Sequence, residues 1–206
     1  MGSVSLKGSN MDELKKRADA FANLLHTRYD IILGRKNVLI NISLNFDKTH
    51  FHHLIGLNRL TDKPQLKKDR AKVFDEIMNG KITYNHINSS TFFKDIEARF
   101  LSFLLIEHLL DNNGLFFKFN RKANPLSKMK TEFILESTIN GDTAYICIDN
   151  YDNTDEYFCR SFFPKEENDY TAKHTRYTLL RKEKLDTISG SKTIQYDRLT
   201  SKASID

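Results

Sequence analysis

The sequence predicts an α+β fold in which a helical layer packs on a small antiparallel β-sheet. Apolar residues recur with helical spacing in the first half of the chain, whereas apolar and polar residues alternate in segments after Gly114. Turn-forming stretches separate these segments, as is typical of an antiparallel meander. Helices that are segregated from strands in this way indicate the α+β class.

Three helices are predicted before Gly114. Residues 10–33 start with a capping-box pattern and continue with apolar residues at helical spacing. Residues 62–80 begin with "DKP" and end at a glycine, and residues 91–111 follow Ser90 as the most apolar helix. These helices would cover one face of the sheet.

The predicted strands follow from alternation and turn signals. Residues 38–44 alternate on the N-terminal side, and "HFHHLI" (50–55) then forms a second short strand or an irregular turn. The strands predicted after Gly114 span residues 115–119, 131–138, 143–149, 157–163 and 177–185, with 192–199 as a candidate edge strand.

No long linker interrupts these elements, so we expect a single domain over residues 10–199, with 10–33 as an accessory N-terminal helix. Residues 1–9 are small and polar, which indicates a disordered or artificial extension rather than a signal peptide. Residues 200–206 predict a frayed tail. The longest apolar run, 100–106, is shorter than the roughly 20 residues that span a membrane, so we expect a cytoplasmic protein without a membrane partner.

Composition narrows the class of protein. The 206 residues are 39% hydrophobic, which is too apolar for disorder, and the net charge of +5 favours a polyanionic partner such as nucleic acid. The two cysteines, Cys147 and Cys159, form no CxxC pair, which argues against a disulfide framework and a cysteine zinc site. Neither a P-loop, a GxGxxG after a strand, nor HExxH occurs.

The stretch "THFHHLIGLNRL" contains three of the seven histidines, His50, His52 and His53. On a strand, neighbouring side chains point to opposite faces, so His52 and His53 cannot both ligate one ion. We therefore favour no metal site and no cofactor. One imidazole faces inward beside Gly56, either as a general base or as a hydrogen-bonded core residue.

Two further segments carry basic and hydroxyl side chains. "NRKANPLSKMK" (120–130) is a basic loop, and "RSFFPKEENDYTAKH" (160–174) combines hydroxyls with an imidazole. Either segment can be an ordinary solvated loop. Together with an inward histidine they supply a base, an acid and cations, which metal-free ribonuclease chemistry needs.

Four blocks in order resemble one family. "FHHLIGLNRLTD", "GKITYNHINSSTFFKDIEARF", "SKMKTEF" and "CRSFFPKEENDYT" are similar to successive motifs of the phage-type Barnase–EndoU–Colicin–RelE (BECR) nuclease domains, most like the fourth phage subtype. The match runs from about residue 37 to 184. The resemblance implies a BECR-like fold and a metal-independent endoribonuclease, acting as a toxin or effector of a phage or mobile element.

The resemblance also implies roles for residues at matching positions. His53 would be the general base, Lys130 would stabilise charge, and Ser161 with Thr171 would hold the phosphate. Tyr170 or His174 would be the general acid or a base-stacking group, although His174 stands where the family suggests a Gln-like residue. The side chains that would bind substrate are Arg99, Arg121, Lys128 and Tyr170.

RNA is therefore the expected partner, with a cognate inhibitor or a host protein as a further candidate. Two alternatives remain open. The same scaffold can bind RNA or DNA without cleaving it, since fold does not fix function. It can also inhibit a host or phage protein, with the acidic loop "DNYDNTDEY" (149–157) as the contact.

Overall fold

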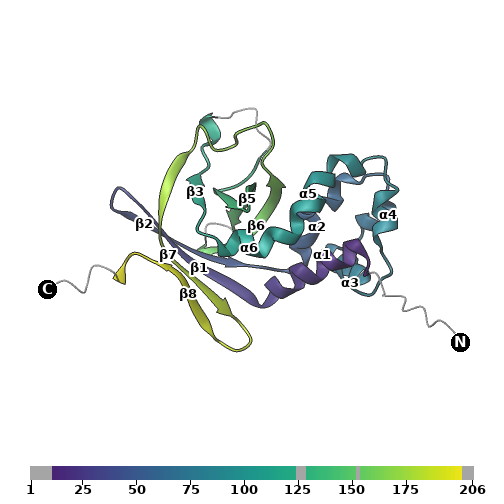
Figure 1. The fold of residues 1–206 in the computed structure, drawn as a ribbon, viewed down its shortest axis with the longest axis horizontal. Helices are drawn as coiled ribbons and strands as arrows, with labels where there is room; N and C mark the ends of the chain where they lie inside the picture. Colours follow the sequence, from purple (N-terminus) through teal and green to yellow (C-terminus); the bar gives the residue numbers. More distant parts are fainter. Residues whose placement is uncertain (1–10, 124–128, 152–153, 201–206) are drawn as a thin grey trace, which may run out of the picture.

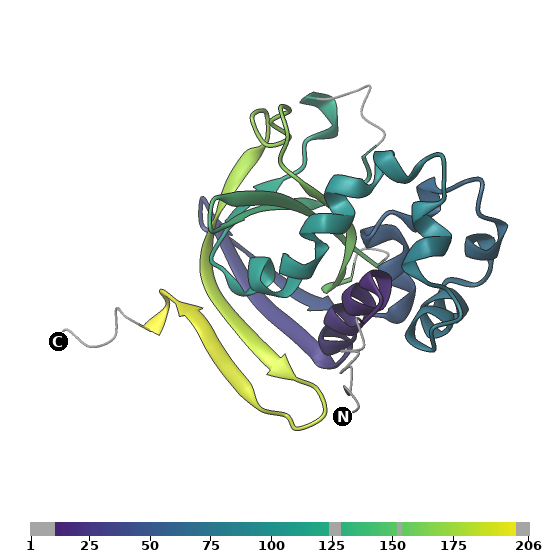
Figure 2. The ribbon, with the colours of Figure 1, turned by 45° about the vertical axis from the view of Figure 1, so that its right-hand side comes forward.

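The strands of this computed structural model form one sheet that closes on itself. The structure describes residues 11–123, 129–151 and 154–200. Within these residues the strand order is β1-β2-β6-β5-β4-β3-β7-β8, and β1 also pairs with β7. All strands except β8 therefore form a closed seven-stranded barrel, and β8 extends the sheet beyond β7 (Figures 1 and 2). The predicted helical layer on a small antiparallel sheet is wrong.

The strands are β1 (Thr27–Arg35), β2 (Val38–Asn45), β3 (Leu115–Lys118), β4 (Phe133–Ile139), β5 (Asp142–Asn150), β6 (Glu156–Pro164), β7 (Thr175–Asp186) and β8 (Lys192–Asp197). The α-helices are α1 (Glu13–Ala22), α2 (Lys48–Leu54), α3 (Arg70–Met78), α4 (Tyr84–Asn88), α5 (Glu97–Ser102) and α6 (Ile106–Asp111). Short 3₁₀ helices η1 (Asn23–His26), η2 (Leu57–Arg59), η3 (Pro64–Lys67), η4 (Phe93–Asp95), η5 (Phe103–Leu105) and η6 (Arg121–Ala123) connect several of them.

Strand β1 explains why the fold prediction failed. The predicted helix over residues 10–33 ends at Ala22, and the chain continues as strand Thr27–Arg35. This strand pairs antiparallel with β2 on one side and with β7 on the other. Because the strand that closes the barrel was assigned to a helix, the sheet was expected to stay open and small.

The barrel is mixed rather than antiparallel. Strand β2 runs parallel to β6, from Ser43 beside Glu156 to Asn45 beside Phe158. A parallel pair needs a crossover connection, and the chain between β2 and β6 contains helices α2 to α6 together with β3, β4 and β5. Consequently α2, which follows β2 directly, contacts β6.

The helical part lies at one side of the barrel (Figure 1). Its core is aromatic: the Phe51 ring lies 5.6 Å from Phe21, 5.3 Å from Phe74 and 5.5 Å from Phe103, measured between centroids. Phe103 also packs edge-on against Phe162 of β6 at 5.7 Å. Each fully buried Phe contributes about 1.5–3 kcal/mol, so this cluster holds α1, α2 and α3 against the barrel wall.

Two predicted helices differ in detail from the observed ones. Residues 91–111 are divided into η4, α5, η5 and α6, and the segment 62–80 into η3 and α3. Residues 49–60 contain most of helix α2 rather than a strand.

Residues 1–9 and 201–206, predicted as an extension and part of a frayed tail, lie outside the described residues. Across the described chain, none of the helices has both the length and the apolar character that crossing a membrane requires.

Candidate active site

An open cavity of about 630 Å³ lies between the helical part and the barrel. Of the residues predicted to form a site, those that line it are His53, Arg99, Lys130, Ser161 and Tyr170. The other charged side chains on its wall are Arg59, Lys94, Arg160, Asp95 and Glu166. Cations therefore outnumber carboxylates among the described residues of this wall. Such a cavity attracts an anion such as a phosphate.

Helix α2 gives its three histidines different environments. Asp47 caps the helix and its backbone N–H donates to His50 Nδ1 at 3.0 Å, so His50 is part of the capping box. His52 is 6% exposed, and its Nε2 lies 2.8 Å from the Leu66 carbonyl oxygen. His53 is half-buried and lines the cavity. The expected opposite facing of His52 and His53 on a strand does not apply, because neighbours on a helix differ by about 100°.

Gly56 lets α2 end close to α5. Its φ of 91° is in the left-handed region, and a Cβ built there would lie 2.8 Å from Ile96 Cγ2. The close approach brings the Arg99 side chain to the end of α2, where Arg99 Nη1 donates to the His53 carbonyl oxygen at 3.2 Å. The glycine therefore fixes the His53 backbone and the Arg99 guanidinium in one place.

Arg99 is a buried cation without a carboxylate partner. It is 9% exposed, and burial, with Arg59 nearby, lowers its pKa to about 10, so it stays charged at neutral pH. No carboxylate in the described part of the chain forms an ion pair with Arg99, Arg59 or Lys130. Buried charge is costly when it is unpaired. A bound anion would supply the missing partner.

His53 is tuned toward the neutral form. Burial lowers its pKa below the usual value, and the positive charges of Arg70 and Arg160 act in the same direction. The Asn58 side chain opposes the shift. A neutral imidazole at neutral pH can accept a proton, as a general base must.

A β-bulge in β6 directs two side chains to the cavity. Ser161 pairs with Cys147 and Cys159 pairs with Ile148, so the register skips Arg160. Bulges re-aim side chains and are common next to active sites. As a result Arg160 and Ser161, although adjacent, both line the cavity, while Phe162 is fully buried in the core.

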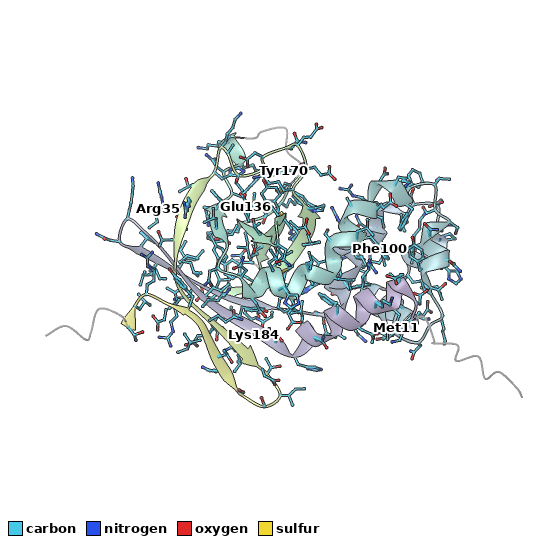
Figure 3. The ribbon with its side chains drawn as sticks, viewed as in Figure 1. Met11, Arg35, Phe100, Glu136, Tyr170 and Lys184 are labelled. Carbon is cyan, nitrogen blue, oxygen red and sulfur yellow. The ribbon has the colours of Figure 1, made fainter. Side chains whose placement is uncertain are left out.

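Lys130 and Tyr170 complete the wall from two loops. Next to Lys130, the Thr131 hydroxyl donates to the Ile148 carbonyl oxygen at 2.8 Å and anchors the entry to β4. Tyr170 lies at the rim of the barrel, on the loop between β6 and β7 (Figure 3). Its ring packs 5.0 Å from Phe163 between centroids and remains 39% exposed.

Residues 13–199 match the family model described as phage-Barnase-EndoU-ColicinE5/D-RelE like nuclease4. The chain belongs to this family. No curated protein and no solved structure matches the sequence. The predicted membership in the fourth phage-type BECR family is thus confirmed, and membership in a nuclease family indicates a nucleic-acid substrate.

Three other predicted site residues, Thr171, His174 and Arg121, are described by the structure and do not line the cavity. Thr171 is 5% exposed and donates to Asp169 at 2.8 Å and to Glu136 at 3.0 Å, so it braces the loop that carries Tyr170. His174 accepts a hydrogen bond from the Asn120 backbone N–H at 3.2 Å, and its ring packs at a tilt against Phe119 with 4.7 Å between centroids. Arg121 is exposed on η6. Lys128 lies outside the described residues.

Sequence reasoning missed three cations of the cavity: Arg59, Lys94 and Arg160. All three lie inside the sequence blocks that resemble the family, and this position could have identified them as candidate site residues. Arg160 forms an ion pair with Asp149 at 2.6 Å, and Lys94 with Glu97 at 2.7 Å. Arg59 is the missed cation that contributes an unpaired charge.

The histidine-rich stretch does not assemble a metal-binding cluster. In the described residues no three His, Cys, Asp or Glu side chains converge in a way that could hold a metal ion. Both cysteines are buried free thiols, and burial raises the pKa of the Cys147 thiol to about 12. Neither thiol is therefore an activated nucleophile at neutral pH.

Proposed function

We propose that the chain is an endoribonuclease that needs no metal ion and cleaves RNA by attack of the 2′-hydroxyl on the adjacent phosphate. One observation carries the proposal: His53, with its lowered pKa, lines the same cavity as the unpaired cations Arg99 and Lys130. Membership in a nuclease family supports a nucleic-acid substrate.

His53 is the general base in this mechanism. Its imidazole accepts the proton of the 2′-hydroxyl while the 2′-oxygen forms a bond to phosphorus. The bond from phosphorus to the 5′-oxygen then breaks, which leaves a 2′,3′-cyclic phosphate on one fragment. DNA lacks the 2′-hydroxyl and cannot react in this way.

Arg99, Lys130 and Ser161 stabilise the charge that develops on the phosphorane. The Arg99 guanidinium is held by the His53 carbonyl and carries no competing carboxylate among the described residues. Donors that are fixed before the reaction stabilise a transition state more than mobile ones. Losing one such donor lowers kcat by roughly 10²–10³.

Tyr170 is the proton donor to the leaving 5′-oxygen. Tyr170 lines the cavity, and the contacts of its ring with Phe163 and Tyr145 hold the side chain in place. His174, the other predicted acid, packs near Phe119 outside this cavity, so the mechanism does not use it. The prediction is that Tyr170→Phe lowers kcat and leaves KM near the wild-type value.

Purified protein incubated with RNA in EDTA tests the proposal. Wild-type protein should release fragments that end in a cyclic phosphate, and His53→Ala should not. His108→Ala is the matched control, because His108 is exposed and does not line the cavity. Cleavage that EDTA abolishes contradicts the metal-free mechanism, and equal cleavage by His53→Ala removes His53 from it.

A single 2′-deoxy residue in the substrate tests the nucleophile. Cleavage at the modified link should stop while cleavage elsewhere continues. Binding without any product, sensitive to salt, would instead favour the non-catalytic nucleic-acid-binding alternative.

The proposal extends to a toxin or effector role in a phage or mobile element, which the name of the family, a phage-type nuclease, supports. Expression of the wild type should stop growth of a bacterial host, and expression of His53→Ala should not. A cognate inhibitor protein is then the expected partner that lets the producing cell survive. Equal growth with both chains argues against this role.

A further inference from the structure

A second hollow adjoins the cavity on the far side of His53. It measures about 390 Å³ and shares His53 and Arg160 with the first cavity. Its other walls include His50, Arg70, Tyr151 and Phe158. The two hollows therefore meet at the His53 and Arg160 side chains.

Aromatic rings form one side of this hollow. Phe158 stacks on His50 with a centroid distance of 5.3 Å and an angle of 27°, and Tyr151 lies 4.5 Å from Phe158 at 33°. The Tyr151 hydroxyl is 2.9 Å from His50 Nε2, and this hydrogen bond fixes the orientation of the Tyr151 ring. Tyr151 is still 42% exposed, so part of its surface is free to contact a ligand.

Cations flank these rings. Arg160 lies over the Phe158 ring at 5.0 Å, and its Nε donates to Asp149 at 2.6 Å. Arg70 opens α3, is exposed, and forms no ion pair with a carboxylate of the described chain. Burial keeps the pKa of His50 below its usual value, so this ring is neutral and behaves as part of the aromatic surface. An exposed ring beside an unpaired cation matches a base and its phosphate.

We propose that this hollow is a nucleobase subsite for the nucleotide next to the scissile phosphate of single-stranded RNA. The base stacks on Tyr151, which Phe158 and His50 support from behind, and Arg70 contacts the phosphate on that side. The subsite rests on the proposed function, because its position along the RNA is defined relative to the phosphate that His53 acts on. A base can stack here only when it is unpaired, so duplex RNA is excluded.

Binding of a non-cleavable probe tests the subsite independently of catalysis. The probe is a short single-stranded 2′-O-methyl RNA with 2-aminopurine at one position, because stacking on an aromatic ring quenches its fluorescence. Moving 2-aminopurine along the strand should reveal one position whose quenching depends on Tyr151. Annealing the probe to its complement should remove that signal.

Three variants separate ring stacking from other effects. Tyr151→Ala should lose the position-specific quenching and bind about tenfold more weakly, whereas Tyr151→Phe should keep both because the ring remains. Phe92→Ala is the matched control, since Phe92 is 39% exposed and lines neither hollow. Arg70→Gln should reduce the salt dependence of binding by about one counterion.

The outcomes distinguish the subsite from the proposed function. Unchanged affinity and quenching in Tyr151→Ala overturn the subsite, even if the wild type cleaves RNA. An equal loss in Tyr151→Ala and Phe92→Ala also overturns it. Quenching that depends on Tyr151 in a protein that cleaves no RNA supports the subsite and overturns the proposed function.

Discussion

Replacing Gly56 by alanine tests how the end of α2 is held against α5. The new Cβ would lie 2.8 Å from Ile96 Cγ2 and 3.3 Å from Arg99 Cδ, and the φ of 91° disfavours any residue with a Cβ. The left-handed conformation costs about 1–2 kcal/mol and overpacking a filled site about 1–3 kcal/mol. We therefore expect Gly56→Ala to lower the free energy of unfolding by about 2–5 kcal/mol.

Gly80→Ala is the matched control for this substitution. Gly80 has a similar φ of 70°, but a Cβ there would meet nothing within 4 Å. Only the conformational cost of about 1–2 kcal/mol remains. Urea unfolding followed by far-UV circular dichroism measures both variants, since the chain has no tryptophan to report on unfolding.

If close packing matters, Gly56→Ala must lower the free energy of unfolding more than Gly80→Ala does. Equal losses of stability in Gly56→Ala and Gly80→Ala would refute the idea that Ile96 excludes a side chain at Gly56. Adding Ile96→Ala to Gly56→Ala removes the nearest atom of the clash, so the cost of Gly56→Ala should be smaller in that background. An unchanged cost would refute the assignment of the clash to Ile96.

The remaining predictions concern charge. Arg70→Gln removes a cation that lowers the pKa of His53, so the acidic limb of kcat/KM against pH should move to higher pH; an unmoved limb would contradict this coupling. Burial also lowers the pKa of His52, so the unfolded chain binds a proton below about pH 6.5 that the folded chain does not. The free energy of unfolding should then fall as pH decreases below about 6.5, less steeply in His52→Gln, and an identical slope in both proteins would count against it. Lys182 is 1% exposed and donates to three carbonyls at the end of α6, so Lys182→Met should lower the free energy of unfolding by about 1–3 kcal/mol in a urea titration; stability equal to wild type would show that those carbonyls find other partners.

The strands after Gly114 could be predicted because they are short apolar segments separated by turn-forming residues, although β5 is buried over five consecutive residues rather than alternating. The predicted segments 143–149 and 157–163 differ from Asp142–Asn150 and Glu156–Pro164 only at their ends. The pairing of the strands could not be predicted in the same way, since the parallel contact of β2 with β6 joins segments that are far apart in the chain. Local patterns carry no information on such a contact.

Strand β1 shows how two periods can coexist in one segment. Leu25, Tyr29 and Ile32 satisfy helical spacing, whereas Tyr29, Ile31 and Leu33 satisfy the spacing of a strand and are the buried residues. Pairing with β2 and β7 decides in favour of the strand. Tertiary contacts therefore overrode a local helical pattern.

The candidate site was predicted unevenly. The family resemblance selected His53, and the structure places it on the cavity, although the argument from strand geometry used the wrong secondary structure. Arg160 was missed because the bulge that turns it to the cavity has no signature in the sequence. The catalytic roles of these residues stay predictions until the variants are measured.

The pairing of β1 with β7 also constrains how the protein is made. Thr27 lies opposite Asp186, so the barrel is closed by strands from nearly opposite ends of the chain. Contacts of such large sequence separation form late and slowly. A growing chain lacks β7 until Asp186 has been made, so the pairing of β1 with β7, which closes the barrel, cannot form before the other six strands of the barrel exist.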